Sequence, residues 1–369
     1  MPPEAFPIEQ ADRAAVQAAW GRQLLLDGLR TLGTVGAALG VGFLITLLVS
    51  PRPFSAYAAL LTGPLTSRNR FGNWLEDATS LALLGLALAL VFQARQFSLL
   101  AEGQLYLGAL VAGILALHLP LPSGIHAAVA LLGAAAVGFL YGLIPGALKA
   151  YLNASELVSS LMLNVVAQRL YELLLTYWLK PPGAGYTWSD FFPGSAILAR
   201  LIPGTRVNVA LLIALGLALL TWLLLYRTSF GYALRMVGAN PEFARYAGIP
   251  TRRIVLFAMA LGGIPAALAG AHLALGIHQR LILSISTGLG FEGIVVALLA
   301  RNNPALVPFA ALLYSYLRVG GDIMERTAAV GSDLVRMIQG IIILFLTAEA
   351  LAAWAQRRLA SRRSTHVGA

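Results

Sequence analysis

The sequence predicts an all-α, polytopic membrane protein with about ten transmembrane helices and a short helix between two of them. Of the 369 residues, 58% are hydrophobic and only 11% are charged, and the mean hydropathy is +0.76. Uncharged runs of about 20 residues recur along the chain, which is the length a helix needs to cross about 30 Å of hydrocarbon. Glycine and proline are frequent, which fits this class because packed membrane helices tolerate both residues. This composition excludes a soluble globular domain.

The apolar runs locate the expected spans. A polar lead-in over residues 1–30 includes a stretch, 14–26, that would suit an interfacial helix anchored by Trp20. The transmembrane region covers 31–355, and a basic tail covers 356–369. Residues 52–77 are expected to be a polar connection, and the glycine-rich segment 284–300 is expected to be a broken or re-entrant helix. We expect spans at 31–50, 78–93, 103–119, 124–148, 157–178, 207–226, 254–277, 284–300, 304–317 and 337–354. Pro120 and Pro122 break the long apolar run between the third and fourth of these spans. In the seventh, Gly262, Ala266 and Gly270 form a stripe that lets a neighbouring helix approach closely.

The loop 227–253, between the sixth and seventh spans, predicts a short helix with both ends specified. Asn240 is a good N-cap, Pro241 suits the first helical position, and Glu242 places a negative charge in the first turn. Gly248 can adopt the left-handed conformation that ends a helix. The helix should cover about 241–247. A capped, basic helix between spans suggests a surface that contacts a partner, although an ordinary loop with a helical turn remains an alternative.

Charge and composition narrow the function classes. The net charge is +10, and basic residues gather in 227–253 and in the tail, which indicates a positive-inside bias rather than nucleic-acid binding. An even number of spans then places both termini and the loop in the cytoplasm. The absence of cysteine excludes disulfides and thiolate sites. His118 and His126 flank a turn without carboxylates nearby, so we expect interfacial residues and no metal site.

Several polar residues fall inside or beside the apolar runs. A charge at mid-membrane costs about 2.5–3.5 kcal/mol on insertion scales, so each needs a reason. They either lie at helix ends in the interface or line a polar path for a hydrophilic solute, and the sequence leaves both open. Glu292 and Arg301 cannot pair on one straight helix, because nine residues put them half a turn out of phase. The set is Glu102, Gln104, Glu156, Asn164, Glu292, Arg301 and Glu349.

Catalytic motifs are missing from the sequence. The chain has no GxxxxGK[ST] loop, because its two lysines, Lys149 and Lys180, precede alanine and proline. HExxH and GxSxG are also absent. Nothing supports hydrolytic or redox chemistry, so we expect a protein that moves a solute rather than an enzyme.

Four stretches carry a resemblance to a known family. GYALRMVGANPEFARYAGI (231–249) closely resembles the cytoplasmic coupling loop of ABC-importer permeases of the branched-chain amino acid, ribose and nucleoside superfamily. AEGQLYLGA (101–109), SELVSSLMLN (155–164) and GFEGIVVALLARNNP (290–304) look like further signatures of its simple-sugar and nucleoside branch. The likeness covers about 30–355, and the last two stretches favour nucleosides.

The resemblance implies a multi-pass subunit of the plasma (inner) membrane with no enzymatic activity and no cofactor of its own. Its implied partners are a second, non-identical permease, a cytoplasmic ATPase that holds ATP and Mg²⁺, an extracytoplasmic solute-binding protein and the lipid bilayer. The residues seated in the ATPase groove would be Asn240, Pro241, Glu242, Arg245, Tyr246 and Gly248. Those near the translocation path would be Gln104, Asn164, Glu292, Arg301, Asn302 and Asn303. Ala300 departs from the family, which often has glycine there.

Two rival interpretations remain open from the sequence. An ion-coupled secondary transporter would use Glu292 or Glu156 as its ion site and would not need a capped cytoplasmic helix. Alternatively, the same ABC architecture would carry ribose, another simple sugar or a branched-chain amino acid. An amino acid would favour charged contacts to its carboxylate.

Overall fold

The computed structural model describes residues 40–44, 46–47, 52–328, 335–337, 339–341 and 344. Residues 60–320 form one compact unit, and 1–59 with 321–369 form another. The lead-in, the tail and most of the first and last expected spans lie outside the described residues. Five described helices are long and apolar enough to cross a membrane: α3 (Arg68–Gln93), α4 (Ala101–His118), α5 (Ile125–Leu152), α7 (Ala210–Arg227) and α10 with its extension (Thr251–His278). A span count of ten therefore stays a prediction.

The prediction that residues 52–77 form a polar connection is wrong. Two helices occupy most of it: α2 (Pro53–Thr62), followed by a 3₁₀ turn (Gly63–Leu65), and the first ten residues of α3. The Ser67 hydroxyl caps α3 by accepting a hydrogen bond from the Arg70 amide at 3.3 Å. Polar residues over 68–77 hid this helix, because hydropathy detects apolar runs and not helix length.

The break in the long apolar run lies where the prolines predicted it, between α4 and α5. His126, at the start of α5, is buried, and its imidazole lies 2.9 Å from the Ser195 hydroxyl and 3.3 Å from the Leu115 carbonyl oxygen. His118, on the other side of the turn, is exposed. The interfacial position of the two histidines stays a prediction. In the described part of the chain no group of three metal-ligating side chains comes together.

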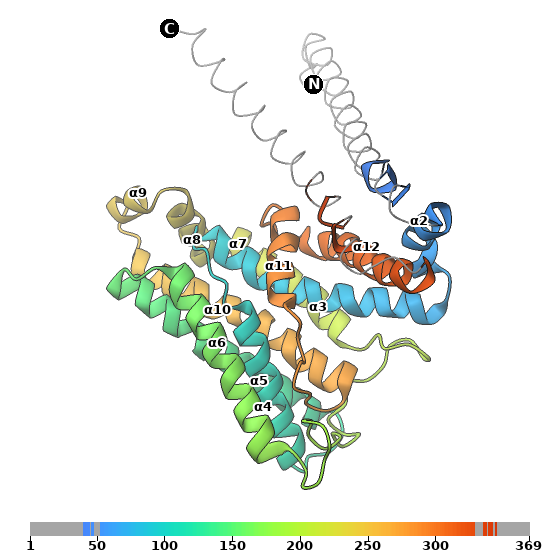
Figure 1. Ribbon diagram of the computed structural model, residues 1–369. Coiled ribbons are helices and arrows are strands. Elements are labelled where there is room, and N and C mark those ends of the chain that lie inside the picture. Colours follow the sequence, from blue (N-terminus) through green and yellow to red (C-terminus); the bar gives the residue numbers. More distant parts are fainter. Residues whose placement is uncertain are drawn as a thin grey trace, which may run out of the picture. The chain divides into compact units, whose positions relative to one another are not determined.

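Small residues let α10 (Thr251–Ala271) pack closely on α3, α4 and α5, as its glycine pattern predicted (Figure 1). A Cβ at Gly270 would lie 1.9 Å from the Leu105 carbonyl oxygen of α4, and one at Gly263 would lie 2.0 Å from the Gly138 oxygen of α5. Because backbones approach to contact there, van der Waals packing holds the core of the bundle together.

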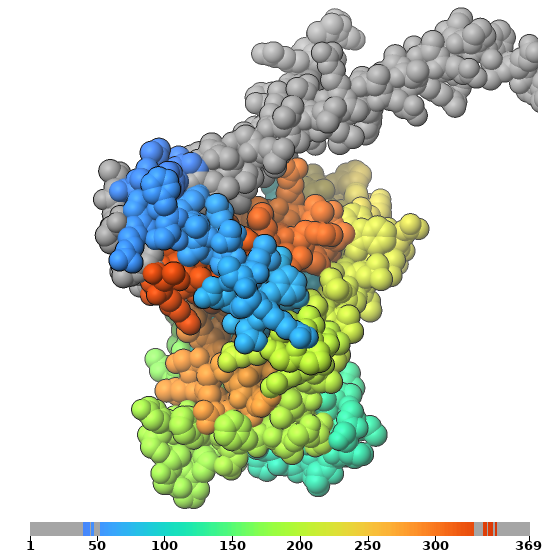
Figure 2. All heavy atoms as spheres, turned by 90° about the vertical axis from the view of Figure 1, so that its right-hand side faces the viewer, coloured from blue at the N-terminus to red at the C-terminus, as the bar shows by residue number. Residues whose placement is uncertain are grey.

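The helix α6 (Glu156–Leu174) continues as a π-helical turn (Leu175–Leu179) and leads into the loop 180–209. Figure 2 shows this loop in lime green at the lower end of the molecule, beside the green atoms around the 119–124 turn. The Arg280 guanidinium lies 4.0 Å above the Trp188 ring and 4.7 Å from the Phe191 ring. These cation–π contacts fasten the loop to the segment after α10.

The remaining helices refine the expected boundaries. The amphipathic helix α8 (Ser229–Ala239) was not predicted, and it precedes α9 (Pro241–Tyr246). Within the segment expected to be broken, only α11 (Leu289–Leu299) is helical. The helix α12 (Val307–Ala328) is longer than the expected 304–317 span, because its polar C-terminal half is also helical.

Candidate functional site

The helix α9 has the ends that the sequence predicted. The Asn240 side-chain oxygen accepts hydrogen bonds from the amides of Glu242 at 3.0 Å and Phe243 at 3.1 Å. Gly248 adopts φ 79°, and its amide donates to the Arg245 carbonyl oxygen at 3.0 Å. Six residues alone would not hold a helix in water, so these caps and the packing below it fix its position.

One face of α9 is anchored and the other is presented outward. Ala244 is fully buried in a cluster with residues of α3, α8 and α10. In contrast, Tyr246 is 94% exposed and Phe243 is 57% exposed. Two exposed aromatic side chains on a rigidly capped helix form a surface that a partner protein could bind, since aromatic residues dominate binding interfaces.

A partly buried, non-helical segment, 279–288, connects the extension of α10 with α11, and two tyrosine side chains hydrogen-bond to its backbone. The hydroxyl of Tyr106 on α4 donates to the Ser286 carbonyl oxygen at 2.9 Å. The hydroxyl of Tyr171 on α6 donates to the Ile282 carbonyl oxygen at 2.7 Å. Irregular backbone at membrane depth requires such partners, because hydrocarbon offers none. The broken segment is therefore held in place from both sides.

Glu102 caps the start of α11 from the start of α4. Its carboxylate accepts hydrogen bonds from the Gly288 amide at 3.2 Å and the Gly290 amide at 2.6 Å. The negative charge also lies at the positive end of the α11 dipole. This buried carboxylate therefore has a structural explanation within the chain and need not face a solute.

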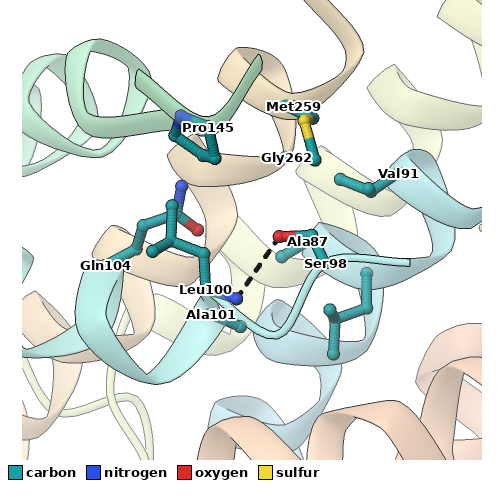
Figure 3. A pocket seen from close by; sticks show the side chains of 10 residues that line it. Ala87, Val91, Ser98, Leu100, Ala101, Gln104, Pro145, Met259 and Gly262 are labelled. Carbon is teal, nitrogen blue, oxygen red and sulfur yellow. Dashed lines mark hydrogen bonds between the residues drawn. The ribbon is translucent and has the colours of Figure 1, made fainter. Parts of the chain in front are cut away.

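Asn164 and Gln104, two of the predicted path residues, lie buried beside the α3–α4 break. The Asn164 side chain accepts a hydrogen bond from the Gly103 amide at 2.7 Å and donates to the Leu99 carbonyl oxygen at 2.5 Å. Gln104 points toward a cavity of about 10 Å³ between α3, α4, α5 and α10 (Figure 3). Such a cavity holds at most about one water molecule. The cavity that Gln104 borders is therefore water-sized, and the Asn164 side-chain amide is occupied by its hydrogen bonds to the backbone.

A charge triad of Asp77, Glu292 and Arg318 joins α3, α11 and α12. One guanidinium nitrogen of Arg318 lies 3.1 Å from an Asp77 carboxylate oxygen and 3.1 Å from a Glu292 oxygen. The exposed fractions of the side chains are 20% for Asp77, 28% for Glu292 and 26% for Arg318. The cluster is therefore mostly desolvated but still reaches the surface of the subunit.

The sequence missed two members of this triad. Arg318 lay beyond the expected 304–317 span, and Asp77 lay in the expected connection. Arg301, in contrast, is exposed in the turn after α11 and does not approach Glu292 as an ion pair within the described residues. A helical assignment to the polar ends of α3 and α12 would have drawn attention to both residues.

The Arg301–Asn303 turn closes α11 near the end of α3. Arg301 and Asn302 adopt positive φ angles of 53° and 57°, and the Gln93 side-chain amide donates to the Asn302 carbonyl oxygen at 2.9 Å. Ala300 is buried with φ −74°, which any residue adopts, so the position does not require glycine.

The comparisons with known proteins agree with this arrangement. The model of the family "Branched-chain amino acid transport system / permease component" matches residues 70–347. The chain belongs to this family. The Haloferax volcanii protein named glucose ABC transporter permease protein TsgB13 is 35% identical over 323 residues, covering 85% of each chain. The Bacillus subtilis guanosine ABC transporter permease protein NupP is 32% identical over 311 residues, covering 84% of this chain and 89% of the relative.

A further relative, the nucleoside ABC transporter permease protein NupB of Lactococcus lactis, is 27% identical over 316 residues and covers 83% of this chain. The family and these relatives identify this permease as a membrane subunit of an ABC transporter of the nucleoside and sugar type. The resemblance found from the four sequence stretches is therefore confirmed.

Proposed function

We propose that this permease is half of the membrane path of an ATP-driven importer, and that nucleosides are its cargo. A second, non-identical permease completes the path, a cytoplasmic ATPase supplies the energy, and an extracytoplasmic binding protein delivers the solute. ATP and Mg²⁺ reside on the ATPase. The observation that supports the proposal most strongly is the structure of α9. Its backbone is capped and anchored, and it exposes the side chains of Phe243 and Tyr246 on a permease of this family.

The helix α9 acts as the coupling helix in this proposal. The contact residues are Asn240, Pro241, Glu242, Arg245, Tyr246 and Gly248. Because Ala244 ties α9 to α3 and α10, a push on the exposed face reaches the spans as a rigid-body displacement. A motor shifts a conformational equilibrium only through contacts that differ between its states, and a rigid helix transmits such a difference.

We further propose that the solute passes the side of the subunit where Glu292 and the charge triad reach the surface. Arg301, Asn302 and Asn303 lie at one end of that side. The triad holds its own charges in ion pairs, so it offers hydrogen-bonding oxygens to a neutral, hydroxyl-rich solute. An amino acid would need unpaired charge for its carboxylate, which the triad does not present.

A simple sugar is the second candidate cargo. The observation that favours a sugar is the identity of 35% to the permease named for glucose, which is similar to the identity of 32% to the permease named for guanosine. Both solutes are neutral and carry several hydroxyl groups, so the path chemistry above suits either. The SSLMLN and FEGIVVALLARNNP stretches favour the nucleoside.

Uptake into proteoliposomes that contain the complete transporter tests this proposal. Labelled guanosine is offered with and without internal ATP, and separately with the proton gradient collapsed. Unlabelled guanosine, glucose, ribose and leucine serve as competitors. ATP-dependent uptake blocked only by guanosine supports the nucleoside importer. Competition by glucose or ribose moves the cargo to sugars, and loss with the gradient alone would favour an ion-coupled transporter.

A further inference from the structure

A basic cavity of about 580 Å³ opens at the α9 end of the bundle. Its wall combines the loop after α3, the end of α5 and the start of α6 with residues of α8, α9 and the start of α10. Four cationic side chains line it: Arg95, Lys149, Arg245 and Arg252. The cavity is distinct from the charge triad and from the small gap at Gln104.

The positive charge in this cavity exceeds the negative charge. Glu156 is the carboxylate in its lining, and it pairs with Lys149 at 2.7 Å. Within the described ranges, no carboxylate forms an ion pair with Arg95, Arg245 or Arg252. Three arginines therefore converge on one space without a protein counter-ion from this part of the chain.

The start of α10 adds to the attraction for an anion. Pro250 is its N-cap residue and provides no side-chain cap, and the first turn holds no acidic residue. Thr251 and Arg252 at this helix start both line the cavity. Arg252 and Arg253 add two positive charges to the positive end of the helix dipole. This arrangement is unfavourable by itself, and a bound anion would relieve the repulsion.

Arg95 directly follows α3, and its backbone closes that helix. It adopts φ 58°, and its amide donates to the Phe92 carbonyl oxygen at 2.9 Å. A left-handed residue just past the last turn is a common way for a helix to end. This turn places Arg95 among the residues that line the cavity.

Exposed apolar side chains lie on the two helices whose ends contribute to the charged wall. Leu152, at the end of α5, is 72% exposed, and Leu157, at the start of α6, is 40% exposed. A ligand that satisfies both surfaces has an anionic head and a hydrocarbon tail. Basic pockets between membrane helices on the cytoplasmic side are suited to such head groups.

We propose that this cavity binds the head group of an anionic glycerophospholipid from the bilayer leaflet at the α9 end. The lipid phosphate contacts Arg95, Arg252 and the start of α10, and its acyl chains lie along the exposed apolar face of α6. Because Pro241 and Arg245 also line the cavity, the bound lipid supports the base of α9.

Lipid titration of the purified permease tests this proposal. The protein in detergent is titrated with phosphatidylglycerol and, separately, phosphatidylcholine, and bound lipid is counted by native mass spectrometry. The variant Arg95→Gln/Arg252→Gln is compared with the matched variant Arg68→Gln/Arg200→Gln, whose two arginines are exposed and outside the cavity. If each arginine contributes roughly fivefold to the affinity, the cavity variant, which lacks two, should bind phosphatidylglycerol about 25-fold more weakly.

Several results would overturn the lipid assignment. These are equal binding of the two lipids by the wild type, equal loss in the two variants, or competition by soluble glycerol phosphate at the lipid's own concentration. Loss of the lipid when the ATPase subunit is added would reassign the cavity to the ATPase. If the cavity variant unfolds, a photoreactive phosphatidylglycerol on the wild type decides instead: label near Tyr151 supports the site, and label spread evenly over the spans contradicts it.

Discussion

Replacing Arg318 by methionine should destabilise the helical unit and stop transport. The substitution keeps the apolar stem of the side chain but removes the guanidinium that the carboxylates of Asp77 and Glu292 share. Breaking a fully buried ion pair in this way costs about 3–5 kcal/mol. The triad side chains are 20–28% exposed, which places the cost nearer 2–3 kcal/mol.

Thermal unfolding of the purified protein measures this effect. A loss of that size should lower the melting temperature by roughly 5 °C for a unit of this length. The matched control is Arg169→Met, because the Arg169 side chain is 73% exposed and its pair with Glu172 is worth little. We expect a shift of under about 1 °C for the control.

A neutral triad should recover the stability. The triple variant Asp77→Asn/Glu292→Gln/Arg318→Met also removes the two carboxylate charges, so its melting temperature should return most of the way to that of the wild type. If Arg318→Met unfolds at the same temperature as the Arg169→Met control, or if the triple variant is worse than the single one, the triad does not join α3, α11 and α12 energetically.

Three further predictions follow from the packing, the triad and the coupling helix. Gly270→Leu should prevent assembly of α10 against α4 and give little folded protein, whereas Gly216→Leu, with open space around it, should express normally; equal yields on size-exclusion chromatography would contradict this. Glu292→Gln should retain most uptake because the amide still accepts from Arg318, while Glu292→Lys should lose it through repulsion; equal, complete loss would instead indicate a proton-carrying carboxylate. Pro241→Gly combined with Gly248→Val should lower ATP-driven uptake several-fold without lowering membrane insertion, and normal uptake would refute the coupling role.

The helical core was largely predictable because its signals are local. Prolines located the α4–α5 turn, the spacing of Gly262, Ala266 and Gly270 located the close-packed face of α10, and Asn240 with Gly248 located both ends of α9. Each of these depends on backbone geometry that a residue type imposes by itself.

The contacts that join distant segments were not predictable in the same way. Asp77 and Arg318 meet Glu292 only because α3 and α12 extend through polar sequence that hydropathy assigns to connections. The hydrogen bonds that the Gly288 and Gly290 amides donate to Glu102 join residues 186 and 188 positions apart. Single-sequence patterns identify a costly residue in a membrane, but a partner far along the chain becomes visible only in the fold.

Cross-linking from α9 to the ATPase tests the central claim most directly. The chain has no cysteine, so Tyr246→Cys introduces its single thiol on the most outward side chain of α9. Tyr186→Cys is the matched control, since Tyr186 is 73% exposed in the loop that follows the far end of α6. Each thiol is labelled with a maleimide photo-cross-linker in the complete transporter. The coupling account predicts that Tyr246→Cys labels the ATPase subunit and Tyr186→Cys does not; equal labelling from both positions, or none from Tyr246→Cys, would contradict it.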